Sequence, residues 1–116
     1  MISFVTLFAR DIECTADVYR LLGFEFVQEQ HGSGPRHLAA VNKGMVLEIY
    51  PGDDAVSPGT MFGVDVADLE DIRAKLLTAK VPVRRDIDSV PGMRRMIVTD
   101  PEMRQIFIRE GARNNG

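Results

Sequence analysis

At 116 residues, with 45% hydrophobic and 27% charged side chains, the chain has the composition of an ordinary globular protein with one hydrophobic core. A net charge of -3 and a pI near 5.3 argue against nucleic acid as the main partner, and a single cysteine excludes an intrachain disulfide. No apolar run approaches the roughly 20 residues of a membrane span, and the start of the chain lacks a basic leader, so we expect a cytoplasmic protein.

Hydrophobic periodicity predicts the elements of the first half of the chain. Asp11 is a helix N-cap residue, and the helix over 12–22 ends at Gly23, which can adopt the left-handed stop. A glycine-rich loop at 31–35 and a hairpin at 42–44 separate the strands. The apolar stripe of the helix consists of Ile12, Ala16, Tyr19 and Leu22. The expected strands are 2–9, 24–30, 36–41 and 45–50.

The second half repeats this order. Residues 4–26 recur loosely at 61–83, so that Asp11 falls on Asp68, a shift of 57 (68 minus 11). Asp68 is therefore expected to cap a second helix, which ends at Lys80. A repeat of this length suits a supersecondary module that needs a second copy to complete its core. The apolar stripe of this helix consists of Leu69, Ile72, Leu76 and Ala79. The expected strands are 60–66, 83–87, 93–99 and 105–110.

These elements predict an α+β fold built from two tandem modules, each with one strand, one helix and three further strands. We expect a single domain over residues 1–116, because the chain is too short for two independent cores. The first module covers 1–51 and the second covers 59–111. The Gly-, Asp- and Pro-containing stretch 52–58 is the linker, and 112–116 is a frayed tail.

Two motifs carry a family resemblance that covers nearly the whole chain. Asp11 through Tyr19 to Leu22-Gly23-Phe24, and Pro91-Gly92-Met93-Arg94 followed by Asp100-Pro101, resemble the glyoxalase, bleomycin-resistance and extradiol-dioxygenase superfamily, also called vicinal oxygen chelate proteins. The resemblance implies two βαβββ modules that form an open, cup-like mixed sheet with helices outside. It also implies a ligand cavity between the modules, and a homodimer whose cavity lies at or near the dimer contact.

Metal-dependent members of this family take ligands from the first and last strand of each module. The matching positions here are Phe4, Glu48, Met61 and Phe107. Only Glu48 suits a divalent cation, because phenylalanine has no lone pair and a methionine thioether is a soft ligand. One carboxylate gives neither the number nor the geometry of ligands that a tight site needs. We therefore expect no metal and no other cofactor in this cavity.

Two histidines are the remaining candidate ligands. His31 falls in the glycine-rich loop and His37 on the following strand, six residues away. Neither helical nor alternate-strand spacing then places both beside Glu48. We expect a solvated loop histidine and a histidine on the sheet surface instead.

Strand alternation predicts the cavity lining once Phe4 and Glu48 are taken to face inward. The inward set mixes aromatic rings, methionine and polar groups, as small-molecule pockets do. It consists of Phe4, Thr6, Phe8, Val46, Glu48, Tyr50, Met61, Gly63, Asp65, Gln105, Phe107 and Arg109. The opposite set is expected to pack under the helices, and consists of Val5, Leu7, Leu47, Ile49, Phe62, Val64, Ile106 and Ile108. A collapsed interior filled by side chains is the alternative.

Two classes of function fit this lining. The first is a protein that sequesters a planar or cationic small molecule, as bleomycin-resistance members do, with Glu48 and Asp65 as the negative charge. The stacking surface would come from Phe4, Phe8, Tyr50 and Phe107. The second is a lyase, isomerase or dioxygenase, either with an atypical metal site or without metal, in which case Glu48 is the general base. An ion pair with Arg109 would instead keep Glu48 ionised and structural.

Other chemistry has little support in the sequence. Cys14 lies near the start of the first helix without a histidine close by in the chain, and we expect a small, partly buried side chain. The segment Gly32-Ser33-Gly34-Pro35 lacks the lysine and the following helix of a phosphate-binding loop.

Overall fold

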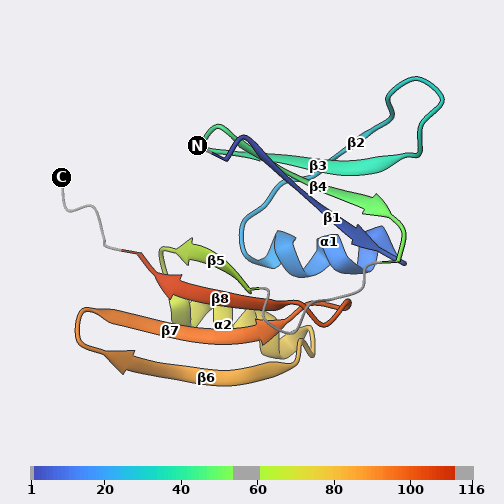
Figure 1. Cartoon of the computed structure of the whole chain (residues 1–116). Coiled ribbons are helices and arrows are strands. Elements are labelled where there is room, and N and C mark those ends of the chain that lie inside the picture. The colour runs from blue at the N-terminus through green and yellow to red at the C-terminus, as the bar shows by residue number, and fades with distance from the viewer. Residues whose placement is uncertain (1, 54–60, 112–116) are drawn as a thin grey trace. The chain divides into compact units, whose positions relative to one another are not determined.

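The computed structural model describes residues 2–53 and 61–111 and divides the chain into two compact units, Met1–Ala55 and Val56–Gly116 (Figure 1). Each unit holds one strand, one helix and three further strands, which confirms the two predicted βαβββ modules and the α+β class. Residues 54–58 of the expected linker and the expected tail lie outside the described residues. No helix in the described ranges has the length and apolar character needed to cross a bilayer.

The first module is a four-stranded mixed sheet with one helix on one face (Figure 1). Its strand order is β1-β4-β3-β2, in which β1 runs parallel to β4 and the other pairs are antiparallel. Asn42-Lys43-Gly44 makes the predicted hairpin, with positive φ at Lys43 (50°) and Gly44 (83°). The elements are β1 Phe4–Ala9, α1 Ile12–Leu21, β2 Val27–Glu29, β3 His37–Asn42 and β4 Met45–Pro51.

The second module repeats this topology. Its strand order is β5-β8-β7-β6, with β5 parallel to β8 and the remaining pairs antiparallel. Two strands differ by three residues at one end from their predicted bounds, and the other strands differ by two residues or fewer. β2 begins only at Val27, after Phe24, whose ring packs edge-on against Tyr19 of α1, while β6 is longer and carries register shifts. The elements are β5 Met61–Val66, α2 Leu69–Thr78, β6 Val83–Val90, β7 Met93–Thr99 and β8 Gln105–Glu110.

The predicted apolar faces form the two cores. In the first module α1 contacts β1, β3 and β4, and Asp11 caps it by accepting the backbone N–H groups of Glu13 and Cys14. Gly23 has the expected positive φ (107°). Of the residues expected under the helices, the buried ones are Leu7, Leu47, Ile49, Ile106 and Ile108, and the half-buried ones are Val5, Phe62 and Val64.

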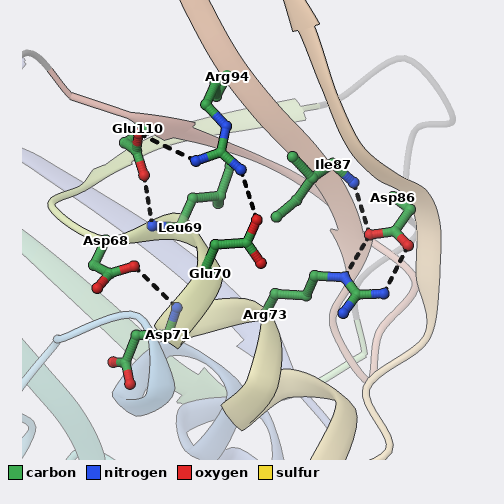
Figure 2. A network of polar contacts seen from close by, with 9 residues as sticks. All are labelled: Asp68, Leu69, Glu70, Asp71, Arg73, Asp86, Ile87, Arg94 and Glu110. Atoms are coloured by element: carbon green, nitrogen blue, oxygen red, sulfur yellow. Dashed lines mark hydrogen bonds and ion pairs between the residues drawn. The ribbon is translucent and has the colours of Figure 1, made fainter.

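Polar contacts hold α2 in the second module (Figure 2). Asp68, the predicted cap, accepts a hydrogen bond from the backbone N–H of Asp71. The carboxylate of Glu110 accepts a hydrogen bond from the backbone N–H of Leu69 at 2.9 Å. The guanidinium of Arg73 makes two hydrogen bonds to Asp86 on β6 (2.7 and 2.9 Å) and lowers the pKa of Asp86 to about 2. The expectation that Ala79 belongs to the apolar stripe is wrong, because Ala79 is the exposed residue that follows the last turn.

The turn between β7 and β8 contains a buried ion pair. Asp100 accepts the backbone N–H groups of Glu102 and Arg104 through one carboxylate oxygen, at 2.9 and 3.0 Å. Its other oxygen accepts the Arg104 guanidinium at 2.9 Å, and both side chains are at most 2% exposed. Met103 in the same turn has a positive φ of 68° and projects outward, 69% exposed.

We predict that Asp100→Asn lowers the free energy of unfolding by about 3 kcal/mol, because it removes the negative charge that faces a buried guanidinium. Urea denaturation of the variant measures the loss. The exposed pair of Lys75 with Asp71 (3.0 Å) is the control, and Lys75→Ala should cost no more than about 0.5 kcal/mol. A loss below about 1 kcal/mol for Asp100→Asn would contradict the assigned role of the pair.

Candidate functional site

One face of the first sheet collects the predicted inward side chains. The parallel register of β1 and β4 pairs Phe4 with Val46, Thr6 with Glu48 and Phe8 with Tyr50. Because side chains alternate between the two faces of a sheet, these six share the face opposite the buried Leu7, Leu47 and Ile49. The structure thus brings the first-module half of the expected lining together.

A hollow of about 650 Å³ opens on this face, and we call it the first-module hollow. Its lining consists of Ser3, Phe4, Glu25, Val27, Glu29, His31, Ala39, Val41, Val46 and Glu48. Phe4 and Glu48 border it as expected, whereas Thr6, Phe8 and Tyr50 lie elsewhere on the same face. Strand alternation did not single out the contributions from β2, β3 and the loop between them.

The most buried polar group near the hollow is His37, the first residue of β3. Its side chain is 1% exposed, so the expectation of a histidine on the sheet surface is wrong. The ring stacks on Tyr50, with centroids 4.0 Å apart and an interplanar angle of 9°. Its Nδ1 atom lies 3.3 Å from the carbonyl oxygen of Pro35. The ring is therefore fixed on one side by stacking and on one edge by a backbone contact.

The other ring nitrogen of His37 faces two carboxylates. Nε2 lies 3.3 Å from Glu29 Oε2 and 3.7 Å from Glu48 Oε2, yet it has no hydrogen-bond partner within the described part of the chain. The antiparallel register pairs Glu29 directly with His37 across β2 and β3, which explains their proximity. A buried polar atom without a partner costs about 1–3 kcal/mol, so such atoms are rare in cores.

His31 joins this group from the glycine-rich loop. Its Nε2 lies 3.4 Å from Glu29 Oε2, and its ring centroid lies 5.0 Å from that of His37. The expectation that His31 is exposed is right, since its side chain is 73% exposed. The expectation that the two histidines stay apart from Glu48 is wrong for His37. The hairpin register between β2 and β3, which residue spacing alone does not reveal, brings these groups together.

Glu48 lies at the edge of this group with its side chain 17% exposed. Burial, the charge of Glu48 and a hydrogen bond with Glu48 raise the pKa of the Tyr50 phenol. The carboxylate of Glu48 thus faces the His37 ring and interacts with the Tyr50 hydroxyl.

The corresponding face of the second module is occupied by ion pairs. The guanidinium of Arg109 binds both carboxylate oxygens of Asp65 at 2.7 and 2.9 Å, and each side chain is about half exposed. A smaller hollow of about 250 Å³ is lined by Gly63, Asp65, Phe107 and Arg109. Arg95 lies 5.8 Å from the centre of the Phe107 ring. The charge of Asp65, which the sequence suggested for ligand binding, is balanced here by Arg109.

The four family metal positions do not fit a metal. Phe4 and Glu48 share a face in the first module, and Met61 and Phe107 lie on β5 and β8 of the second. Their donor chemistry is one carboxylate and one thioether, which does not suit a cation that prefers nitrogen and oxygen ligands.

Cys14 is exposed, contrary to the expected partial burial. Its Sγ donates to Asp11 Oδ2 at 3.2 Å, and this hydrogen bond and the charge of Asp11 raise the pKa of the thiol. A thiol held in its protonated form is a poor nucleophile, which agrees with the expectation from the sequence.

Comparisons with known proteins agree with this architecture. A sequence model of the Glyoxalase/Bleomycin resistance protein/Dioxygenase superfamily matches residues 1–106. Among solved structures, the oxidase ChaP-H2 has a TM-score of 0.77 at 20% identity, covering 100% of this chain and 97% of that one. TioX from Micromonospora sp. ML1 has a TM-score of 0.73 at 18% identity, covering 95% of this chain and 98% of that one. Lactoylglutathione lyase from Agrobacterium tumefaciens has a TM-score of 0.69 at 18% identity, covering 99% of this chain and 96% of that one. No curated protein matches the sequence.

We predict that His37→Phe changes the free energy of unfolding by less than about 1 kcal/mol in the presence of a chelator. Phenylalanine keeps the stack on Tyr50 and removes a polar atom whose burial is costly, which offsets the lost contact with Pro35. Urea denaturation measures the change. A loss of about 3 kcal/mol, as expected for Asp100→Asn, would show that Nε2 is satisfied in solution.

Proposed function

We propose that this chain, which belongs to the glyoxalase/bleomycin resistance protein/dioxygenase superfamily, binds a small molecule that carries a cationic group on an apolar body. The observation that carries the proposal is the first-module hollow. Its volume of about 650 Å³ lies within the range of about 300–1,000 Å³ found for ligand pockets. A ligand for this hollow would match the polarity and charge of its walls.

The charge of the walls favours a cation. Glu25, Glu29 and Glu48 border the hollow, and its described lining contains no arginine or lysine. Carboxylates that lack a nearby basic side chain attract a positive group strongly, since low-dielectric walls reduce solvent screening. His31, the remaining ionisable residue of the lining, contacts Glu29.

The rest of the lining favours an apolar body. Phe4, Val27 and Val41 are 58%, 60% and 77% exposed, although each lies on the sheet face that borders the hollow. Exposed apolar side chains gathered around a concave site indicate a ligand or a partner surface. The Phe4 ring supplies a flat surface on which an aromatic or cationic group can stack.

Catalysis is the second candidate, because Glu48 combines low exposure with two neighbouring ring systems. As a general base it would take a proton from a bound substrate, with His37 and Tyr50 holding its position. Sequestration and catalysis differ in what happens to the ligand. Mass spectrometry of the ligand after prolonged incubation distinguishes them: a sequestered molecule is recovered unchanged.

We predict that Glu48→Gln weakens binding of an organic cation by about 2 kcal/mol, roughly 30-fold, because the amide keeps the shape and removes the charge. Titration calorimetry with a panel of cationic aromatic compounds, in the presence of a chelator, measures the effect. Phe4→Ala and Phe107→Ala probe stacking in each module separately. Asp17→Asn on the exposed side of α1 is the charge control and should leave the affinity unchanged. Equal affinity of the wild type and Glu48→Gln for every binder found would refute the cation proposal.

We also expect a homodimer, as the family resemblance implies and as the exposed apolar side chains around the first-module hollow support. Light scattering should give about twice the monomer mass of 12.9 kDa. Val41→Lys should shift the protein toward monomer, whereas Leu77→Lys on α2, at a position 45% exposed, should not. A monomer at every concentration, or equal effects of the two variants, would contradict a dimer through this face.

A further inference from the structure

Two imidazoles and a carboxylate converge at the end of the first-module hollow. The ligand atoms of Glu29, His31 and His37 all lie within 4.8 Å of one another. Glu29 Oε2 is 3.4 Å from His31 Nε2 and 3.3 Å from His37 Nε2, and Glu48 Oε2 is 3.7 Å from His37 Nε2. We propose that these four residues bind a divalent cation of the zinc class. The proposal goes beyond the binding of an organic molecule and does not depend on it.

The distances suit coordination. A tetrahedral ion with bonds of about 2.1 Å to nitrogen and oxygen places neighbouring ligand atoms about 3.4 Å apart. Glu29 Oε2 lies 3.3 and 3.4 Å from the two imidazole nitrogens, close to this value. Glu48 Oε2 lies 3.7 Å from His37 Nε2 but outside the group of atoms within 4.8 Å of one another, so its carboxylate must move inward to join the ion as the fourth ligand. His31 is the only member that is mostly exposed, at 73%, and it lies in a loop, so it can complete the geometry without moving a strand. Imidazole and carboxylate together are typical zinc ligands.

His37 supplies an independent argument. Its Nε2 is buried, points toward two carboxylates and makes no hydrogen bond within the described ranges, although the Glu29 oxygen is only 3.3 Å away. Its Nδ1 lies 3.3 Å from the backbone carbonyl of Pro35. A metal-binding histidine usually donates its second ring N–H to a carbonyl or carboxylate in this way, which presents the other nitrogen to the metal. A cation in front of Nε2 would satisfy this atom and both carboxylates at once.

The second module shows how the equivalent place is filled when the protein supplies the positive charge itself. Glu29 faces His37 across β2 and β3, and in the duplicate Asp88 faces Arg95 across β6 and β7. The Arg95 guanidinium binds Asp88 at 2.8 Å. The first module has the acid but carries an imidazole, which can bind a metal ion, where the second has a permanent cation. A bound metal ion would supply the positive charge that Arg95 supplies in the second module.

This site differs from the four positions at which metal-dependent relatives hold their ion. Only Glu48 is common to both, and the other three ligands lie on β2, β3 and the loop between them. All four residues belong to the first module, so the site requires no contribution from the second.

The test is metal titration of protein stripped by a chelator, in the absence of any organic ligand. Co²⁺ reports its coordination through visible absorption bands, and Zn²⁺ affinity is measured by competition with a chromophoric chelator. We expect one equivalent of metal per chain. His31→Ala and His37→Phe should each weaken Zn²⁺ binding by more than about 100-fold, since loss of an outer-shell partner alone costs about 10- to 100-fold.

Glu25→Gln is the matched control, because Glu25 borders the same hollow but, unlike Glu29 and Glu48, makes no ion pair with His31 or His37 in the described residues. It should change Zn²⁺ affinity by less than about threefold, because Glu25 is exposed and solvent screens its charge. Circular dichroism checks that each variant is folded, and exposed His31 provides a ligand variant that does not disturb the core. Absence of stoichiometric binding, or equal effects of Glu25→Gln and His31→Ala, would overturn the proposal. Organic-cation binding is measured with chelator present and Zn²⁺ binding is measured without any organic ligand, so the two proposals can fail separately.

Discussion

The alternation of side chains across the first sheet is the constraint on which both its core and its site depend. One face of β1, β3 and β4 is aliphatic and lies under α1, while the other carries the acids, the aromatic rings and His37. A shift of one residue in any strand pairing would exchange these two sets. Burial of Leu7, Ile49 and Leu38 therefore stabilises the fold and, through the same registers, holds Glu29 and Glu48 beside His37.

The carboxylates on the two sheets have different partners. In the second, acids on the sheet are matched by arginines, as in the pairs of Asp65 with Arg109 and Asp86 with Arg73. In the first, Glu29 and Glu48 contact only histidines among the charged side chains that the structure describes. Uncompensated polar groups reduce stability, and natural proteins retain them mainly at functional sites. This asymmetry locates the candidate site in the first module.

Much of the fold could be predicted from the sequence because local signals determine it. Asp11 and Asp68 cap their helices through hydrogen bonds to backbone groups two or three residues ahead, so the tertiary fold is not needed to predict them. Period-two alternation correctly grouped Phe4 with Glu48. The spacing between the two histidines does not reveal their cluster, since it depends on how a hairpin closes. The signal lay in the predicted loop 31–35, which is centred on Ser33 and therefore pairs Glu29 with His37 when the hairpin closes. Ala79 was misassigned because the sequence does not fix a helix end to better than one or two residues, and α2 ends at Thr78.

The shared topology of the duplicated modules makes the source of positive charge exchangeable. The facing positions Glu29 and His37 in one copy correspond to Asp88 and Arg95 in the other, on antiparallel strand pairs of which only β6 with β7 carries register shifts. Two substitutions at such a pair would convert a copy that carries its own counter-ion into one that binds an external cation at the proposed site, and neither alters the buried face beneath the helix. Duplication of the module thus leaves one copy whose acid is neutralised by its own arginine. The other copy, with the same fold, can gain a site for a cation from solution.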